Sequence, residues 1–414
     1  MPNELKQRRT VYSASAQEVV EARGVGLNLN DEEVEEEVFH AVESIGGLPN
    51  DVESATSVMI KPNIGAPDIR EHKGRQIALS EPCVTRAVLR MIREVNKNDV
   101  FVCDAPAGSL GPLAERLGYT NIVKEFGARL VDLNEGPYVE VEVPNAVCCR
   151  KYYVNKDAAD ADAVVSIAKL KAHIFAGVSL CMKNLFGLPP SEFYGVVGRT
   201  YLHYPFRLPR CLVDLTSAFK PCLNIIEGIV GEDFEEWTGP PVETEVLVTG
   251  INSVAVDATG TRLMGFDPEA DFPQEPFLFD INHIKLASTI GLGPIYEKDI
   301  KVIGDNVNAL KTQFHKKLPM GLSPKFHLKA RKGLSQDAEY YWDNLDALVK
   351  VYKGEYIGIL EGKVLSSAET MRELQLRVPF FHTVQREGAY KVPLIKKVYP
   401  KYEDPELREV FNQP

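Results

Sequence analysis

Residues 57–108 read SVMIKPNIGAPDIREHKGRQIALSEPCVTRAVLRMIREVNKNDVFVCDAPAG, and this stretch indicates the class of fold. The apolar run SVMI is followed by Lys, Pro, Asn and Gly. This pattern is typical of a buried strand that ends in a loop. Residues 84–95 have helical spacing of apolar side chains, and residues 99–108 repeat the pattern of strand followed by turn. We interpret this segment as one βαβ unit.

Apolar runs of strand length recur beyond this unit. They are ARLVDL from Ala128, EVEV from Glu140, AVVSIAKL from Ala163, LNIIEGI from Leu223 and VLVTGI from Val246. Strands that alternate with helices are typical of α/β proteins. We therefore predict a mixed, largely parallel sheet with flanking helices.

The length of 414 residues exceeds what one hydrophobic core usually serves, so we expect more than one region. An N-terminal helical region, 1–54, contains the amphipathic run 31–45, whose acidic residues we assign to a solvated face. The α/β body spans 55–300. A basic, turn-rich C-terminal extension, 301–414, is expected to pack on the body or on a second subunit, which would make the protein a homo-oligomer.

Composition excludes several classes of protein. Hydrophobic residues make up 44% and charged residues 25%, as in ordinary globular chains, and the net charge of −11 disfavours nucleic-acid binding. No apolar run approaches the roughly 20 residues of a membrane span, and the start MPNELKQRRT lacks the apolar core of a signal peptide. We therefore expect a cytoplasmic protein without membrane contacts.

The seven cysteines are an odd number without CxxC spacing. This pattern favours buried thiols over a disulfide framework or a zinc ribbon, and we expect no intrinsic iron–sulfur cluster. The chain also lacks GxGxxG after a strand, the Walker-type GxxxxGK[ST] and GxSxG. The simple dinucleotide, P-loop and hydrolase interpretations are therefore excluded.

Basic side chains gather around the strand predicted at 163–170. Lys169, Lys171 and His173 alternate, so in an extended chain they share one face, and Lys183 follows in CMKNLFGLPP beside a constrained turn. Buried lysines without partners are costly, which favours a pocket that binds carboxylate or phosphate. The alternative is a solvated strand end with a hydrogen-bonded core histidine.

Polar residues also follow the two strands of the βαβ unit. Lys61 and Asn63 lie at the carboxyl end of the first strand, and Asp104 lies at the end of the second. Open α/β sheets bind ligands at this edge, so we treat all three as substrate-binding candidates. Asp104 could equally begin an Asx-type turn.

Two further candidates come from turn-rich segments. Asn184 follows Lys183 directly and joins the substrate-binding set, and His203 stands among aromatic residues and prolines in RTYLHYPFRLPR. His203 suits a proton carrier or a metal ligand, and the alternative is a histidine packed against aromatic rings.

Acidic positions complete the candidates. Glu227 stands where IIEGIVGEDFEEWTGPP leaves a strand, and we consider it a base or ligand that contacts the substrate. Glu232 and Asp233 are expected in a solvated loop, without a role. Asp257, in a helical pattern, is expected to cap a helix or to accept buried hydrogen bonds.

Four ordered blocks, SIAKLKAH, MKNLFGLPP, IIEGIVG with a following GPP, and SVAVDATGTRLMGFDP, resemble the signature blocks of the DUF362 family of unknown function. The resemblance covers about residues 55–295. Some members of that family resemble iron–sulfur proteins, but this chain lacks their clustered cysteines.

A local stretch, HIFAGVSLCMK at 173–183, is similar to nickel-pincer lactate racemases. This likeness implies His173 as a proton carrier, Lys183 as the tether of a pincer cofactor and His203 as a nickel ligand. The racemases present a histidine after an earlier strand, where this chain has Asp104 followed by Ala-Pro-Ala. One of the paired bases is therefore unmatched.

We predict an enzyme that acts on a small carboxylate or phosphate by acid/base chemistry. His173, Lys183 and His203 would be its catalytic residues. One alternative is a 2-hydroxy-acid racemase, epimerase or oxidoreductase with a nickel-pincer cofactor or a divalent metal. Another is a non-catalytic protein that binds anions or assembles through its C-terminal extension.

Overall fold

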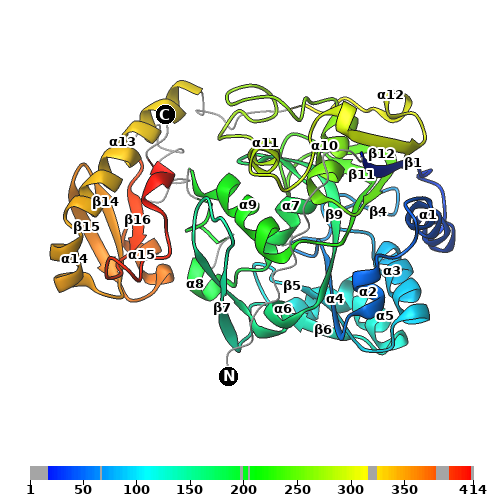
Figure 1. Ribbon diagram of the computed structural model, residues 1–414, viewed down its shortest axis with the longest axis horizontal. Coiled ribbons are helices and arrows are strands. Elements are labelled where there is room, and N and C mark those ends of the chain that lie inside the picture. The colour runs from blue at the N-terminus through cyan, green and yellow to red at the C-terminus, as the bar shows by residue number, and fades with distance from the viewer. Residues whose placement is uncertain are drawn as a thin grey trace.

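A nine-stranded sheet forms the centre of the molecule in the computed structural model, which describes residues 17–65, 68–195, 199–203, 206–315, 324–378 and 391–411 (Figure 1). Its strands run in the order β13-β1-β12-β11-β9-β2-β5-β6, and β10 pairs with the end of β9. The strands are β1 (Glu18–Gly24), β2 (Ser57–Pro62), β5 (Asp99–Asp104), β6 (Arg129–Asp132), β9 (Ala163–His173), β10 (Gly177–Ser179), β11 (Leu223–Glu232), β12 (Pro241–Gly250) and β13 (Ile300–Gly304).

Strand pairing confirms a mixed, largely parallel α/β sheet. Strands β6, β5, β2, β9 and β11 are parallel neighbours, whereas β12 runs antiparallel to both β11 and β1. The segment 57–108 forms the predicted βαβ unit, with β2 and β5 paired in parallel and α3 (Pro82–Val95) between them in sequence. The carboxyl ends of these adjacent parallel strands therefore meet at one edge of the sheet.

Side-chain alternation along β9 assigns the two faces of the sheet. Val165 and Ile167 join the apolar cluster built on α1 (Asp31–Ser44) and α3, while Ala168 and Leu170 join the cluster containing α10 (Ser253–Leu263). Lys169, Lys171 and His173 continue the first face beyond the apolar residues.

The acidic run of α1 is only partly a solvated face, contrary to the expectation. Glu35 is buried, and its carboxylate pairs with Arg86 from α3 at 2.7 Å. The helix is therefore attached to its neighbour by an ion pair as well as by its apolar stripe.

Shorter elements surround this sheet. The helices are α2 (Asn50–Ser54), α4 (Leu110–Leu117), α5 (Tyr119–Glu125), α6 (Lys156–Asp160), α7 (Cys181–Asn184), η1 (Leu185–Gly187), α8 (Ser191–Tyr194), α9 (Arg207–Phe219), α11 (His283–Thr289), η2 (Glu297–Asp299) and α12 (Val307–Leu310). Two small hairpins are β3 (Glu71–His72) with β4 (Arg75–Gln76), and β7 (Tyr138–Glu142) with β8 (Lys151–Asn155).

The C-terminal unit is a small sheet with helices beside the body, coloured gold to red in Figure 1. Its sheet has the order β15-β14-β16, and α13 is a 20-residue helix where turns were predicted. Its elements are α13 (Pro324–Asp343), α14 (Leu345–Tyr352), β14 (Tyr356–Leu360), β15 (Lys363–Ala368), α15 (Met371–Arg377), β16 (Leu394–Lys397) and η3 (Arg408–Phe411).

The predicted regions differ from the observed elements at both ends. Strand β1, from the region predicted to be helical, lies inside the central sheet, and β13 carries that sheet past residue 300. Most of the basic segment before α13 and the stretch 379–385 lie outside the described residues. Within the described part of the chain, no helix is long and apolar enough to cross a membrane.

Candidate functional site

A cavity of about 90 Å³ lies at the carboxyl edge of the sheet, where β2, β5 and β9 end. Eight of the ten predicted site residues line it: Lys61, Asn63, Asp104, Lys171, His173, Lys183, Asn184 and His203. Lys169 and Glu227 do not line it. The lining also includes Ser179, Phe186, Gly187, Arg199, Glu236 and Trp237, which were not among the predicted site residues.

Lys61 and Asp104 form a buried ion pair at this edge of the sheet, with Lys61 Nζ 2.8 Å from Asp104 Oδ1. The Lys61 ammonium also donates to the Pro62 carbonyl at 2.9 Å and to Asn184 Oδ1 at 3.2 Å, so its three N–H bonds have acceptors. The Asp104 carboxylate accepts from the Ile64 N–H at 2.8 Å. The pair therefore holds two strand ends together, and its charges are already compensated.

Gly187 and Asn184 hold α7 and η1 close to this pair. Asn184 Nδ2 donates to the Lys61 carbonyl at 2.6 Å and to Ser166 Oγ at 3.0 Å. A Cβ on Gly187 would lie 2.4 Å from Asp104 Oδ1 and 2.6 Å from Lys61 Cε, closer than any side chain tolerates. A glycine is therefore required for η1 to cover the ion pair.

Lys171 is buried on the same face of β9 and hydrogen-bonded rather than ion-paired. Its Nζ donates to Asn63 Oδ1 at 3.2 Å and to the Ala78 carbonyl at 2.9 Å. Burial lowers the pKa of Lys171, and the carboxylates of Glu232 and Glu236 oppose that shift. The alternative of a solvated strand end is therefore wrong for this residue.

His173 ends β9 with each ring nitrogen in a distinct environment. Its Nδ1 accepts hydrogen bonds from the Phe175 and Ala176 N–H groups, both at 3.1 Å, while Nε2 lies 3.3 Å from Glu236 Oε1. Because Nδ1 accepts two N–H bonds, we assign the proton of the neutral ring to Nε2. Proton exchange by His173 would therefore run through Nε2 and Glu236.

Lys183 lies on the short helix α7, directly before the tight turn η1. Asp257 accepts from the Cys181 N–H at 2.8 Å and the Met182 N–H at 2.9 Å, which agrees with its predicted role as an acceptor of buried hydrogen bonds. The Lys183 ammonium lies 4.6 Å from the centre of the Phe186 ring. Burial lowers the pKa of Lys183 to about 7, with Glu236 opposing the shift and Lys171 adding repulsion.

Arg199 and His203 come from the loop that precedes α9. The guanidinium of Arg199 donates to the Ala105 carbonyl at 2.6 Å and to the Pro189 carbonyl, and burial lowers its pKa to about 10. The ring of His203 meets Phe186 edge-on at 4.5 Å and lies nearly parallel to the ring of His173 at 6.2 Å. His203 is thus both packed against an aromatic ring and part of the cavity wall.

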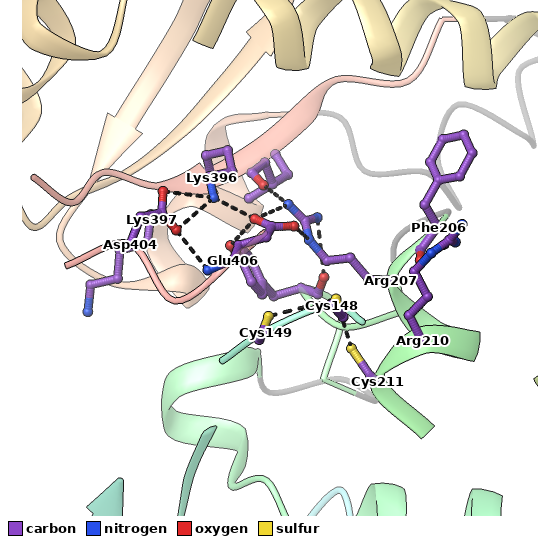
Figure 2. Close-up of polar contacts among 12 residues, drawn as sticks. Cys148, Cys149, Phe206, Arg207, Arg210, Cys211, Lys396, Lys397, Asp404 and Glu406 are labelled. Atoms are coloured by element: carbon purple, nitrogen blue, oxygen red, sulfur yellow. Dashed lines mark hydrogen bonds and ion pairs between the residues drawn. The ribbon is translucent and has the colours of Figure 1, made fainter. Parts of the chain in front are cut away.

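The C-terminal unit anchors this loop through buried ionic contacts, shown in Figure 2. Arg207, the first residue of α9, pairs with Glu406 at 2.5 Å, and Glu406 also pairs with Lys396 at 2.5 Å. Thr200 accepts a hydrogen bond from Gln375 at 2.7 Å. Residues of the C-terminal unit therefore set the position of the outer cavity wall.

Lys169 and Glu227 form a separate, fully buried ion pair behind the cavity, with Nζ and Oε2 2.7 Å apart. Glu227 also accepts from the Ile229 N–H at 2.8 Å. Burial and the nearby Glu227 charge raise the pKa of Glu81 to about 7. The Lys169–Glu227 pair joins β9 to β11 and does not line the cavity.

Glu236 and Trp237, from the segment 232–239, line the cavity, and the solvated loop predicted for Glu232 and Asp233 is wrong. Glu232 is fully buried and pairs with Arg70 at 2.6 Å, and Asp233 accepts from the His315 N–H at 2.7 Å. This loop carries Glu236, whose carboxylate accepts from the Ile174 N–H at 2.9 Å.

The described side chains near the cavity do not by themselves form a metal site. Among the described residues, no group of three or more His, Cys, Asp or Glu side chains could hold a metal ion. His173 has Nδ1 hydrogen-bonded to backbone N–H groups and Nε2 beside Glu236, so both of its nitrogens already contact groups of the protein.

Residues 58–262 match the family described as Domain of unknown function (DUF362). This chain carries a DUF362 domain. The predicted family is thus confirmed, and the match ends short of the expected residue 295. Over 234 residues the chain is 27% identical to a thylakoid-associated protein of Synechocystis sp., covering 55% of this chain and 68% of that protein.

Two solved structures resemble this chain at low identity. One is the lactate racemase apoprotein from Thermoanaerobacterium thermosaccharolyticum, with a TM-score of 0.40, 14% identity and coverage of 60% of this chain and 57% of that one. The other is a Thermotoga maritima protein, with a TM-score of 0.35, 13% identity and coverage of 58% and 60%. The chain spans less than two thirds of both structures.

Proposed function

We propose that this DUF362 protein is an enzyme that binds a small carboxylate or phosphate in the cavity and transfers protons to or from it. The observation that carries the proposal is the charge of the lining. Lys61, Lys171, Lys183 and Arg199 face two carboxylates, Asp104 and Glu236. A bound anion would supply the missing negative charge, because buried cations without counter-charges are costly.

The position of the cavity supports the same conclusion. It lies outside the carboxyl ends of parallel strands, where open α/β sheets bind ligands. Its volume of about 90 Å³ suits a small ligand. The His173–Glu236 pair is the proton-carrying element of the lining, since His173 Nε2 faces Glu236 Oε1 at 3.3 Å.

Calorimetric titration with phosphate and with propionate tests the binding step. We expect one of these anions to bind and its affinity to fall at least about tenfold when Lys183→Met removes a cation, since one buried charge contact contributes about 1.4 kcal/mol or more. The exposed Lys97→Met variant is the matched control and should bind as the natural protein does. Equal affinity in both variants would overturn the proposal.

A metabolite screen tests the catalytic step. We expect the protein to turn over a small anionic compound. Glu236→Gln should lower the turnover rate at least about 100-fold, because it keeps the shape of the side chain but removes its ability to take a proton. Anion binding without turnover of any screened compound would contradict the enzyme assignment and favour a non-catalytic anion-binding protein.

A further inference from the structure

We infer that Lys183 acts as a nucleophilic amine that forms an imine with the carbonyl carbon of a small 2-oxo acid. This inference rests on the proposed anion site and names its substrate class. Its first support is that Lys183 Nζ, in the described part of the chain, makes no hydrogen bond and no ion pair, although the residue lines the cavity.

The other lysines near the cavity are occupied. Lys61 pairs with Asp104, Lys169 pairs with Glu227, and Lys171 donates to Asn63 and Ala78. A lysine whose ammonium donates to carboxylate, amide or carbonyl oxygens is stabilised in its protonated form, which has no lone pair with which to attack carbon. Lys183 therefore differs from its neighbours in the property that imine formation requires.

The surroundings of Lys183 favour the neutral amine. Phe186 covers one side of Nζ, and the lining places other cations in the same small cavity. Burial among these cations lowers the pKa of Lys183 to about 7, and this is how lysines that form imines are activated.

His283 is close enough to Lys183 for their charges to interact, yet it offers no negative charge. Its ring is fully buried, and burial together with the Lys183 charge lowers its pKa to about 3. Among the described residues, neither ring nitrogen of His283 has a hydrogen-bond partner. The histidine is therefore neutral near pH 7 and does not stabilise Lys183 as an ammonium.

The same lining selects a carbonyl compound that bears a carboxylate. Once Lys183 is neutral, Arg199, whose pKa of about 10 keeps it charged near pH 7, and the N–H donors of Lys171 can hold a carboxylate beside the amine. The cavity volume of about 90 Å³ favours the smallest 2-oxo acids, such as glyoxylate and pyruvate.

The step balances without an oxidant or a reductant. The Lys183 lone pair forms the C–N bond, the carbonyl π pair moves to oxygen, and a proton passes from nitrogen to that oxygen. A second proton converts the hydroxyl group into water, which leaves as the C=N bond forms, and the remaining N–H proton returns to the base. The His173–Glu236 pair is the proton carrier available in the lining.

Reductive trapping tests the inference. The full-length protein is incubated with pyruvate or glyoxylate and sodium borohydride, which reduces an imine to a stable secondary amine, and peptide mapping by mass spectrometry locates the adduct. We expect one adduct per chain, on Lys183. Lys183→Arg should lower labelling at least about tenfold because its guanidinium keeps its proton, while the exposed Lys97→Arg should leave labelling unchanged.

Propionate separates failure of the inference from failure of the proposed function. It carries the carboxylate but no carbonyl, so it should raise the melting temperature and slow labelling without forming an adduct. Anion-dependent stabilisation with no adduct on Lys183 would overturn the imine alone. Absence of stabilisation by propionate, pyruvate and phosphate would overturn the anion site and with it the imine. Should Lys183→Arg fail to fold, the mapped position in the natural protein decides.

Discussion

Gly187 shows how tightly single residues are fitted around the cavity. Its Cα passes over the Lys61–Asp104 pair so closely that an added methyl group would lie 2.4 Å from Asp104 Oδ1. We predict that Gly187→Ala lowers the free energy of unfolding by about 1–3 kcal/mol, the usual cost of overpacking a buried site. Urea denaturation measures this.

The control for that variant is Gly111→Ala. Gly111 lies in α4, and a Cβ added there would meet nothing within 4 Å, so alanine should leave stability unchanged or raise it by up to about 1 kcal/mol. Equal effects of the two substitutions would show that the ion pair can move aside.

We predict that the buried amine of Lys183 lowers the free energy of unfolding, because burial disfavours its charged form. Its pKa is about 7 in the folded chain, below the ordinary value of about 10.4 that we expect when unfolded. Between these values the unfolded chain binds more protons, so stability should rise with pH in this window. Lys183→Met removes this dependence and should stabilise the protein most below pH 7.

We expect a gain of roughly 1–4 kcal/mol at pH 6, as when buried charges are replaced by apolar side chains. The gain should shrink as the pH approaches about 10, and urea denaturation across this range measures it. Lys97→Met is the control. A gain that does not vary with pH would mean that Lys183 has an ordinary pKa.

Residue patterns predicted the cavity better than they predicted individual contacts. Alternation along 163–173 placed Lys171 and His173 on the cavity side, but could not show that Lys169 meets Glu227 from β11, 58 positions further on. Arg199 and Glu236 were missed for a related physical reason. Both lie on irregular loops, where no periodicity tells which side chain turns inward.

Among the elements, the loop before α9 depends on contacts from a distant part of the chain. Arg207, Glu406 and Lys396 form a buried network, in which Arg207 and Lys396 outweigh burial and lower the pKa of Glu406 to about 2 (Figure 2). Arg199 and His203 lie shortly before Arg207 in the sequence and form part of the cavity wall. Weakening the network should therefore loosen the wall.

We predict that Glu406→Gln lowers the unfolding free energy by about 3–5 kcal/mol, because it removes the carboxylate that pairs with the buried Arg207, while Lys396 keeps its ion pair with Asp404. Anion affinity should fall with it, although Glu406 does not line the cavity. The stability supplied by Glu406 is present above its unfolded pKa of about 4.3 and is lost as the pH falls through about 2. Urea denaturation and calorimetric titration measure the two effects.

Asp343→Asn is the matched control for the ionic network. It removes an ion pair with Arg408 whose side chains are 67% and 51% exposed, so the expected change is about 0–1 kcal/mol. Similar losses in both variants, or full anion affinity in Glu406→Gln, would argue against a link between the C-terminal unit and the cavity wall.

The sequence predicted which segments form strands better than it predicted which sheet each strand joins. The apolar runs at 57–60, 99–103 and 163–168 are buried strands of the central sheet, as predicted. The run EVEV became β7 of a separate hairpin, and β1 joined the central sheet from outside the predicted body. Such pairings depend on residues far apart in the chain, which local pattern does not record.

In the whole molecule, the C-terminal unit shares a hydrophobic core with the body. One cluster of buried residues includes Leu212 and Phe186 from the body together with Leu334, Ile357 and Leu394. We predict that a chain ending at residue 315 has a melting temperature at least about 5 °C lower, or aggregates, because it exposes this apolar surface.

Differential scanning calorimetry of the truncated and full-length chains measures this. An unchanged melting temperature with loss of self-association would instead favour the expectation that the extension serves assembly.

The proposal that the cavity holds a small anion is tested most directly by identifying what occupies the cavity. A crystal structure of the protein isolated from its native source would reveal this. We expect density for a carboxylate or phosphate group in contact with Lys171, Lys183 or Arg199. A cavity filled by water alone, with Lys183 paired to a carboxylate of the protein, would contradict the proposed anion site.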